Sequence, residues 1–376
     1  MLPYILLLFV PLLFSCVSFS YHIAERNRKW TIVIGQRREV LEHSCVLPVF
    51  FLLFIILLSL RDETIGRDLD NYRLYFYHYA ALDIEDIFTQ EKTDILYWLL
   101  TWAIGQLTNN YQIFLAVVAI ITVLPISYVY GKDRKHGFLK MVLFMNMSIF
   151  VMIFSGLRQA IAISVGLIAY EFVKKKQFIG FLIAALIAFG FHHTGFMVFL
   201  FYPLYHMTIK TKHLWFVIPG MLVFYGFKES IFTWGTDMLN RLAGEKYEAE
   251  ITETGAYTML ILFILFAVFV YLIPDEKNMD PETLGLRNFL LMTVILQCFA
   301  PIHALAMRMN YYFIIFIPIL IPKIISTPRE NTKEMAWIAK YVMLAFFVAF
   351  YLITTYVSCQ TGISDLDTYP YVPFWK

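Results

Sequence analysis

The chain has 376 residues, of which 60% are hydrophobic and 15% are charged, and its formal net charge is +2. A soluble globular domain carries roughly a quarter charged residues, so this composition excludes an ordinary soluble protein and indicates a membrane protein. Long continuous apolar runs, without strict alternation, predict a bundle of transmembrane helices and exclude a β-barrel. The small net charge gives no indication of a nucleic-acid partner.

The N-terminal part sets the predicted topology. An apolar run over residues 1–20 is followed by a segment, residues 21–45, that contains five arginines and lysines. The positive-inside rule places that segment in the cytoplasm and the N-terminus outside. The run lacks the basic start and the small-residue cleavage site of a signal peptide, so it is predicted to be a transmembrane helix. A second span, residues 46–60, then leads outward.

The first large outer loop is predicted over residues 61–110. Its short apolar piece, Asp94 to Leu107, begins with an acid and contains Trp98 and Trp102. A full crossing here would place the basic residues 132–135 outside, against the charge rule, so an interfacial or re-entrant helix is predicted.

The later apolar runs complete an all-α prediction of about twelve transmembrane helices in a single membrane domain, residues 1–376. The C-terminus lies outside in this topology, and a second outer loop spans residues 229–256. The remaining predicted spans are 111–130, 138–154, 158–173, 177–191, 196–208, 214–228, 257–273, 288–305, 309–325 and 336–356.

Polar motifs follow one another at the predicted outer ends of these helices. The segment 66–72 offers a glycine for a tight turn and then carboxylates and a tyrosine that suit sugar rings, although an ordinary interfacial loop is the alternative. Its candidate side chains are Arg67, Asp68, Asp70 and Tyr72.

Two arginines lie at outer helix ends. Arg158 belongs to Ser155-Gly156-Leu157-Arg158-Gln159, and Arg308 is flanked by apolar helix on both sides. A guanidinium is costly within a bilayer, and its planar fork suits phosphate. If the two arginines converge, they would clamp a diphosphate. Alternatively, each arginine side chain could simply extend to the membrane interface.

His192 precedes His193 and Thr194 at another outer helix end. Histidine can act as a general base near neutral pH, although a buried histidine is often only satisfied by a neighbour. No spaced set of other ligands accompanies this pair, so no metal site is predicted. The C-terminal tail, residues 365–376, either lines a groove or anchors at the interface, with Tyr371 as its candidate contact.

The sequence lacks the motifs that are typical of other classes of membrane protein. There is no phosphate-binding glycine loop and no GxSxG motif, which argues against an ATP-driven pump or a serine hydrolase. Few acids lie within the predicted spans, which argues against ion-coupled transport.

In this order, the motifs resemble the EpsG family, which comprises Wzy-like bacterial polysaccharide polymerases. The resemblance runs from about residue 60 to the C-terminus, and its most specific piece is the sequence SGLRQ at residues 155–159. Arg67 stands where such proteins often have threonine, and Thr194 stands where a serine is expected. The further matching pieces are Phe191-His192, Arg308 with Tyr312, and Tyr369-Pro370-Tyr371.

The resemblance implies a GT-C-like, multi-pass protein of the bacterial cytoplasmic membrane with its active site facing outside. The implied reaction polymerises polyprenyl-diphosphate-linked oligosaccharide repeat units into capsule, exopolysaccharide or O-antigen. The partners are those lipid-linked oligosaccharides and the bilayer, together with a chain-length regulator and a flippase; no cofactor or metal is implied.

Each candidate residue then has an expected role. Catalytic contacts are expected from His192, Asp68 and Asp70, diphosphate contacts from Arg158, Arg308 and Gln159, and glycan contacts from Arg67, Tyr72, Tyr312 and Tyr371. Two alternatives stay open: a transferase that adds one sugar from a polyprenyl-phosphate donor, and a flippase or transporter of a glycolipid.

Overall fold

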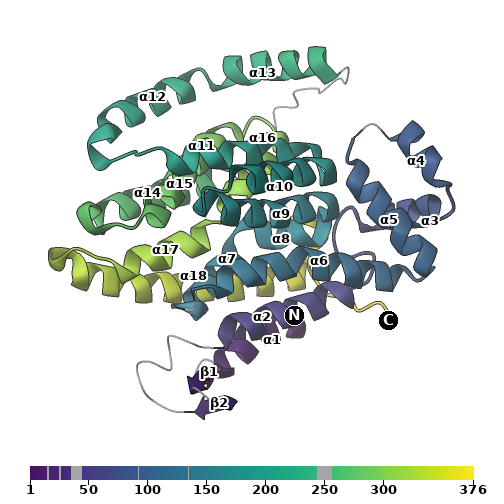
Figure 1. Cartoon of the computed structure of the whole chain (residues 1–376), viewed down its shortest axis with the longest axis horizontal. Coiled ribbons are helices and arrows are strands. Elements are labelled where there is room, and N and C mark those ends of the chain that lie inside the picture. The colour runs from purple at the N-terminus through teal and green to yellow at the C-terminus, as the bar shows by residue number, and fades with distance from the viewer. Residues whose placement is uncertain (15–16, 25–26, 35–44, 92, 134, 244–255) are drawn as a thin grey trace. The chain divides into compact units, whose positions relative to one another are not determined.

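The computed structural model describes residues 1–376 except 15–16, 25–26, 35–44, 92, 134 and 244–255 (Figure 1). The described residues form two compact units, residues 1–199 with 340–376 and residues 200–339. The predicted helical class is confirmed, because helices make up nearly all of the regular structure in both units. That the two units belong to one membrane domain stays a prediction.

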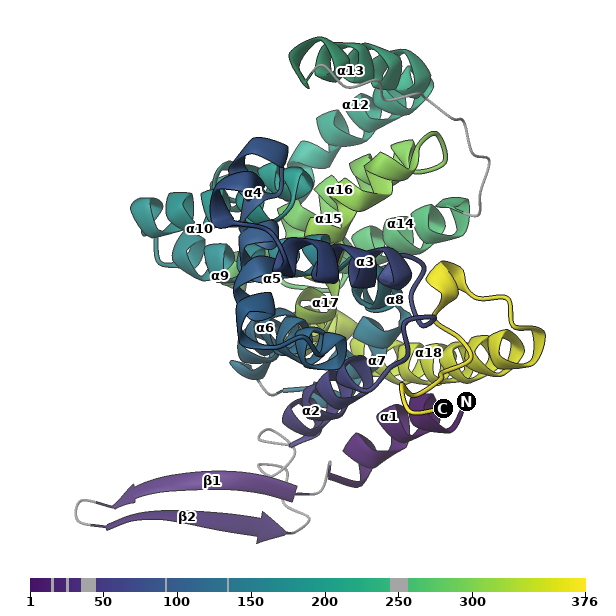
Figure 2. The same ribbon diagram turned by 90° about the vertical axis from the view of Figure 1, so that its right-hand side faces the viewer.

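The first unit holds most of the polar motifs, and its helices are labelled in Figure 2. Its helices are α1 (Leu2–Leu13), α2 (Val46–Ser59), α3 (Leu69–Ala80), α4 (Ile84–Gln90), α5 (Ile95–Leu107), α6 (Tyr111–Gly131), α7 (Gly137–Asn146), α8 (Ser148–Ser155), α9 (Leu157–Lys174), α10 (Phe178–Phe191) and most of α18 (Lys333–Thr361). The 3-10 helices η3 (His193–Leu200) and η7 (Asp365–Asp367) accompany them, although Leu200 already belongs to the second unit.

One hairpin interrupts the helical pattern near the N-terminus. Strands β1 (Val17–Ala24) and β2 (Asn27–Ile34) pair antiparallel, with Val17 opposite Ile34. The prediction of a helical span over residues 1–20 is therefore wrong from Val17 on, where β1 begins. Alternating β-branched and aromatic residues favour the extended conformation, and this period-2 signal was hidden within an apolar run.

Helix α9 is central to the first unit, because it packs against both α6 and α10. It buries small residues such as Ala162 and Ala169, and α10 buries Ala184, Ala185 and Ala188. Small side chains let helix backbones approach closely, which is the usual basis of helix association in a membrane.

The segment predicted as the first outer loop is itself largely helical. It contains α3, α4 and α5. The helix predicted over 94–107 is present as α5, whereas its interfacial or re-entrant position stays a prediction. Aromatic side chains of α3 and α5 pack on α6 and α9, with the rings of Tyr79 and Trp98 stacked at 4.4 Å. The polar motifs of this segment therefore lie on a fixed scaffold.

The second unit is organised around one helix, α15, which packs against α11, α14, α16 and α17. Its elements are α11 (Phe201–His206), η4 (Thr211–His213), α12 (Leu214–Gly226), α13 (Lys228–Ala243), α14 (Ala256–Leu272), η5 (Glu276–Asn278), α15 (Pro281–Phe299), α16 (Ala304–Ile314), α17 (Ile317–Ser326) and η6 (Glu330–Thr332). The predicted second outer loop, residues 229–256, thus contains the helix α13.

Several predicted spans are broken or shifted. The span 138–154 is two helices, α7 and α8, bent by 63°, and 309–325 covers parts of α16 and α17, bent by 42°. Asn146 and Ser148 favour helix ends, and Pro318 cannot continue a preceding helix, which accounts for both breaks. The span 196–208 is a 3-10 helix followed by the short α11, and the span 288–305 is replaced by α15, which starts at Pro281 and ends at Phe299.

Fewer helices than predicted are long enough to cross a membrane alone. Among the described residues, Tyr111–Gly131 and Glu330–Thr361 are long and apolar enough, and three bent helix pairs raise the number to five. Five shorter apolar helices of 10–17 residues accompany them. The prediction of about twelve spans is therefore not confirmed.

Replacing Gly66 by alanine is expected to destabilise the protein by about 1–3 kcal/mol. Gly66 has a φ of +119°, and an added Cβ would lie 2.3 Å from the carbonyl oxygen of Phe154. Gly131→Ala is the matched control, because nothing lies within 4 Å of that position. Thermal unfolding in detergent micelles should show a lower transition for Gly66→Ala alone; equal transitions would contradict the packing described.

Candidate functional site

The carboxylate of Asp94 joins three segments of the first unit. Asp94 precedes α5 with a φ of +58°, a left-handed conformation that aspartate tolerates better than most residues. Its Oδ2 accepts a hydrogen bond from Nη1 of Arg158 at 2.9 Å, and its Oδ1 accepts one from the backbone N–H of His193 at 2.7 Å. Because its side chain is only 1% exposed, this pairing replaces the water that an ionised carboxylate requires.

Arg158 is held from several sides at the beginning of α9. Its Nε lies 3.5 Å from the hydroxyl of Tyr72, and its guanidinium carbon lies 5.2 Å from the ring centroid of Trp98. Such cation–π contact adds to the ion pair with Asp94. Nη2 makes no hydrogen bond to a described residue, and the side chain is 30% exposed. The guanidinium is therefore fixed in direction, with donors left for a ligand.

His192 and Thr194 form a second set of contacts beside this ion pair. Nδ1 of His192 accepts the backbone N–H of Thr194 at 3.1 Å and lies 2.7 Å from the Thr194 hydroxyl. That hydroxyl also accepts Nε2–H of Gln159 at 3.3 Å. An Nδ1 that accepts an N–H carries no proton, so the geometry assigns the proton of neutral His192 to Nε2.

The two adjacent histidines differ in exposure. His192 is buried, whereas the side chain of His193 is 36% exposed and its Nδ1 lies 3.6 Å from Oδ1 of Asp94. Their rings stack with centroids 4.3 Å apart. The surface of the cluster therefore presents His193 and Arg158, and Asp94 lies beneath them.

The charge state of Asp94 follows from its partners. Burial by itself raises the pKa of this carboxyl, but the hydrogen bond with His193 and the positive charge of Arg158 outweigh it, so the pKa is lowered. Asp94 is consequently ionised at neutral pH and compensates the charge of Arg158.

Asp94, His192 and His193 have side chains that could together hold a metal ion. Ligand atoms of Asp94, His192 and His193 lie within 4.8 Å of one another. Arg158, however, already occupies one oxygen of Asp94, and a guanidinium at 2.9 Å repels a cation. The expectation that the protein uses no metal stays a prediction.

The predicted residues of the segment 66–72 divide between two environments. Tyr72 is buried beside Arg158, whereas Asp68 and Asp70 are exposed at the start of α3. The carbonyl oxygen of Asp68 accepts the backbone N–H of Tyr72, but among the described residues neither carboxylate is hydrogen-bonded to Arg158, His192 or His193. Arg67 pairs with Asp367 at 3.3 Å, and its backbone N–H donates to Oγ of Ser155 at 2.9 Å. This turn thus contacts the C-terminal tail and the end of α8.

The remaining predicted residues belong to the C-terminal tail and to the second unit. Tyr371 donates its hydroxyl proton to the carbonyl oxygen of Leu57 at 2.9 Å, which fastens the tail to α2. Arg308 and Tyr312 belong to α16 in the second unit, where Arg308 is exposed and Tyr312 is fully buried. A clamp formed by Arg158 and Arg308 together stays a prediction.

Sequence reasoning missed Asp94 and passed over His193. Asp94 served only to mark the start of an apolar helix, and His193 was considered merely as a neighbour of His192. The available signal was the acid itself, because a carboxylate bordering an aromatic-rich apolar helix needs a cationic partner. Which cation supplies the charge could not be identified, since Arg158 is 64 residues away.

Comparison with known proteins supports one family. The model described as the EpsG family matches residues 44–372, nearly the whole chain. No curated protein and no solved structure matches the chain.

Replacing Asp94 by asparagine is expected to lower stability by about 1–3 kcal/mol at neutral pH, since Arg158 loses its counter-charge. A lowered folded-state pKa means that the carboxylate stabilises the fold fully above its unfolded pKa of about 3.9 and loses that effect as pH falls through the folded value. The difference between wild type and Asp94→Asn should therefore shrink in acid.

Thermal unfolding measured from pH 3 to pH 8 would test this dependence. Asp86→Asn is the control, because Asp86 is an exposed carboxylate on α4. A stability difference for Asp94→Asn that grows on acidification would contradict the assignment.

Proposed function

The chain belongs to the EpsG family, and on that premise we propose that it is a Wzy-like polymerase. It joins polyprenyl-diphosphate-linked repeat units on the outer face of the bacterial cytoplasmic membrane. Family membership supports a polymerase-like role in polysaccharide biosynthesis. The observation that carries the proposal is the fixed guanidinium of Arg158, half-enclosed beside two histidines and backed by the carboxylate of Asp94.

The leaving group of this reaction is a lipid diphosphate, whose negative charge grows as the glycosidic bond to it breaks. Preorganised donors aimed at developing charge are usually the largest single contribution to catalysis. Arg158 supplies such donors without having to reorient, because Asp94, Tyr72 and Trp98 hold its guanidinium.

The beginning of α9 adds to this electrostatic environment. The first backbone hydrogen bond of this helix runs from the N–H of Ala160 to the carbonyl oxygen of Gly156, at 2.8 Å. The N–H groups before Ala160 have no carbonyl partner within α9, and the positive end of the helix dipole favours an anion. A diphosphate beside Arg158 would meet both.

The acceptor is a sugar hydroxyl, which must be oriented and deprotonated. A general base must reach that proton, and His193 has the more accessible ring of the two histidines. His193 therefore contacts the acceptor in this proposal, while His192 contacts Thr194, whose hydroxyl also accepts a hydrogen bond from Gln159. Arg308 stays the candidate for a second diphosphate contact.

Replacing Arg158 by lysine is expected to slow polymerisation by about 100-fold or more, the scale seen when one preorganised donor is removed. Lysine keeps the charge but loses the planar fork that meets Asp94 and a phosphate together. The measurement is the amount and length of polymer in a deletion strain complemented with each variant. Arg329→Lys is the control, because Arg329 bonds the carbonyl oxygen of Pro274 in the second unit.

The deletion strain itself separates the proposal from its alternatives. A polymerase predicts single lipid-linked repeats on the outer leaflet and no polymer. Accumulation of repeats inside the cell would identify a flippase instead, and a repeat unit lacking one sugar would identify a single-sugar transferase. Wild-type polymer made by Arg158→Lys would remove Arg158 from the mechanism.

Replacing His193 by alanine is expected to lower the rate by at least about 100-fold, the usual contribution of a general base. Polymer formation from purified lipid-linked repeats would measure this rate, with His78→Ala, an exposed histidine of α3, as control. A wild-type rate in His193→Ala together with a loss of activity in His192→Ala would return the role to His192.

A further inference from the structure

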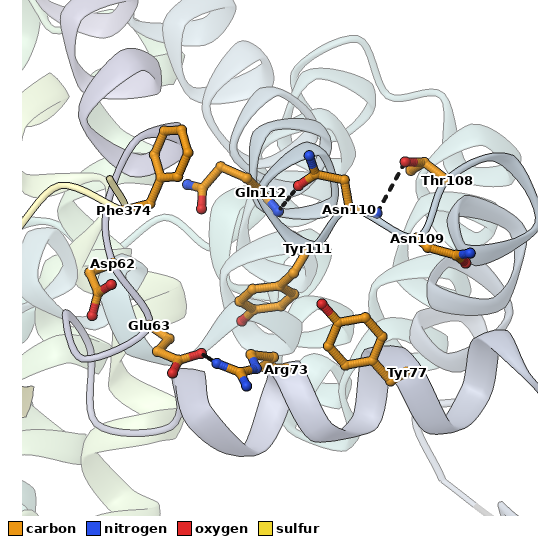
Figure 3. Close-up of a pocket in the computed structure, with 10 residues that line it drawn as sticks. All are labelled: Asp62, Glu63, Arg73, Tyr77, Thr108, Asn109, Asn110, Tyr111, Gln112 and Phe374. Carbon is orange, nitrogen blue, oxygen red and sulfur yellow. Dashed lines mark hydrogen bonds and ion pairs between the residues drawn. The ribbon is translucent and has the colours of Figure 1, made fainter. Parts of the chain in front are cut away.

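A polar pocket of about 690 Å³ lies in the first unit, and none of the predicted site residues lines it (Figure 3). Its walls come from the segment before α3, the exposed face of α3, the start of α6 and the C-terminal tail. Among the residues that line the pocket are Asp62, Glu63, Arg73, Tyr77, Asn109 and Gln112.

Hydrogen bonds fix two sides of this pocket. Gln112 donates through Nε2 to the carbonyl oxygens of Ser59 and Arg61. The tail pairs with the same stretch of chain, because Phe374 donates its N–H to Leu60 and Asp62 donates its N–H to Val372, at 3.0 and 2.9 Å. The pocket is thus formed before any ligand arrives, which reduces the entropy cost of binding.

Several polar atoms on its walls make no hydrogen bond to a described residue. They are the hydroxyl of Tyr77, both polar atoms of the Asn109 side chain, Oε1 of Gln112 and Oδ2 of Asp62. Figure 3 shows Tyr77 and Arg73 on neighbouring turns of one helix, with the amide side chains on a different segment. Together they offer donors, acceptors and one half-exposed aromatic ring.

Charge decides which ligand this pocket suits. Asp62 and Glu63 are acidic, and the one lining arginine, Arg73, is paired with Glu63. An anion such as a diphosphate would be repelled, and a lipid tail would find too little apolar surface. A neutral molecule with many hydroxyl groups and an apolar ring face would satisfy the unpaired atoms and stack on Tyr77.

Helix α3 links this pocket to the Arg158 cluster. Tyr72 lies on its buried side and reaches Nε of Arg158 at 3.5 Å, whereas Arg73 and Tyr77 line the pocket on its exposed side. The hydroxyl of Tyr111, a pocket residue, donates to the carbonyl oxygen of Leu69 in the first turn of α3. A glycan whose diphosphate end meets Arg158 could therefore extend across this helix.

We propose that this pocket binds neutral sugar residues of a glycan chain, separately from the site that binds the diphosphate. The inference rests on the proposed function, since it assigns the pocket to the sugars of the growing polymer that are remote from the lipid. Retention of the chain there would favour repeated addition and thus long products.

Direct binding tests the pocket without requiring catalysis. Full-length protein in lipid nanodiscs is mixed with a panel of neutral di- to tetrasaccharides built from hexoses and N-acetylhexosamines, and saturation transfer to the sugar protons is measured. Tyr77→Ala should weaken binding about tenfold, the equivalent of about 1.4 kcal/mol, and Tyr77→Phe should weaken it less. Asn109→Ala should also weaken it.

The control on the same helix is Leu74→Ala, because Leu74 is 65% exposed and does not line the pocket. It should bind the saccharides as wild type does, and added pyrophosphate should not displace them. Displacement by pyrophosphate, unchanged affinity in Tyr77→Ala, or binding of no saccharide in the panel would each overturn the proposal.

Product length then separates this inference from the proposed function. In complemented cells, Tyr77→Ala should still form polymer, but with shorter chains than Leu74→Ala. Wild-type chain length in Tyr77→Ala would overturn the role in polymerisation. Absence of polymer even with the wild-type protein would refute the polymerase itself, and the saccharide-binding result would be unaffected.

Discussion

The buried carboxylate of Asp94 is the constraint on which the first unit depends. An ionised carboxylate costs several kcal/mol to take out of water unless its oxygens are paired. Here one oxygen is paired with Arg158 and the other with the backbone of His193. The starts of α5, α9 and η3 must therefore meet at one point, and any fold that separates them leaves a charge uncompensated.

That meeting point explains why the polar motifs act together. The breaks between α8 and α9 and between α10 and η3 both expose helix ends next to Asp94. Arg158, His193 and free backbone N–H groups are consequently collected within one environment, although they come from separate helices. Helix ends are where unpaired backbone groups are available for ligands, so the broken helices are part of the site.

Helix α3 gives the site a second side. Its buried face supplies Tyr72 to the Arg158 cluster, and its exposed face supplies Arg73 and Tyr77 to a pocket with opposite chemistry. One side suits a diphosphate and the other suits neutral sugars. A lipid-linked glycan has both parts in a single molecule, so in our proposal the two faces of α3 bind different parts of one substrate.

The sequence by itself determined the helical class and the family resemblance, because hydropathy and short motifs are local properties. It also predicted a helix over residues 94–107, where the structure has Ile95–Leu107. Only the tertiary structure brought Asp94 to Arg158 and left Asp68 and Asp70 exposed. Those outcomes depend on which charged groups from distant segments are buried together, and the order of residues along the chain does not specify which charged groups pair.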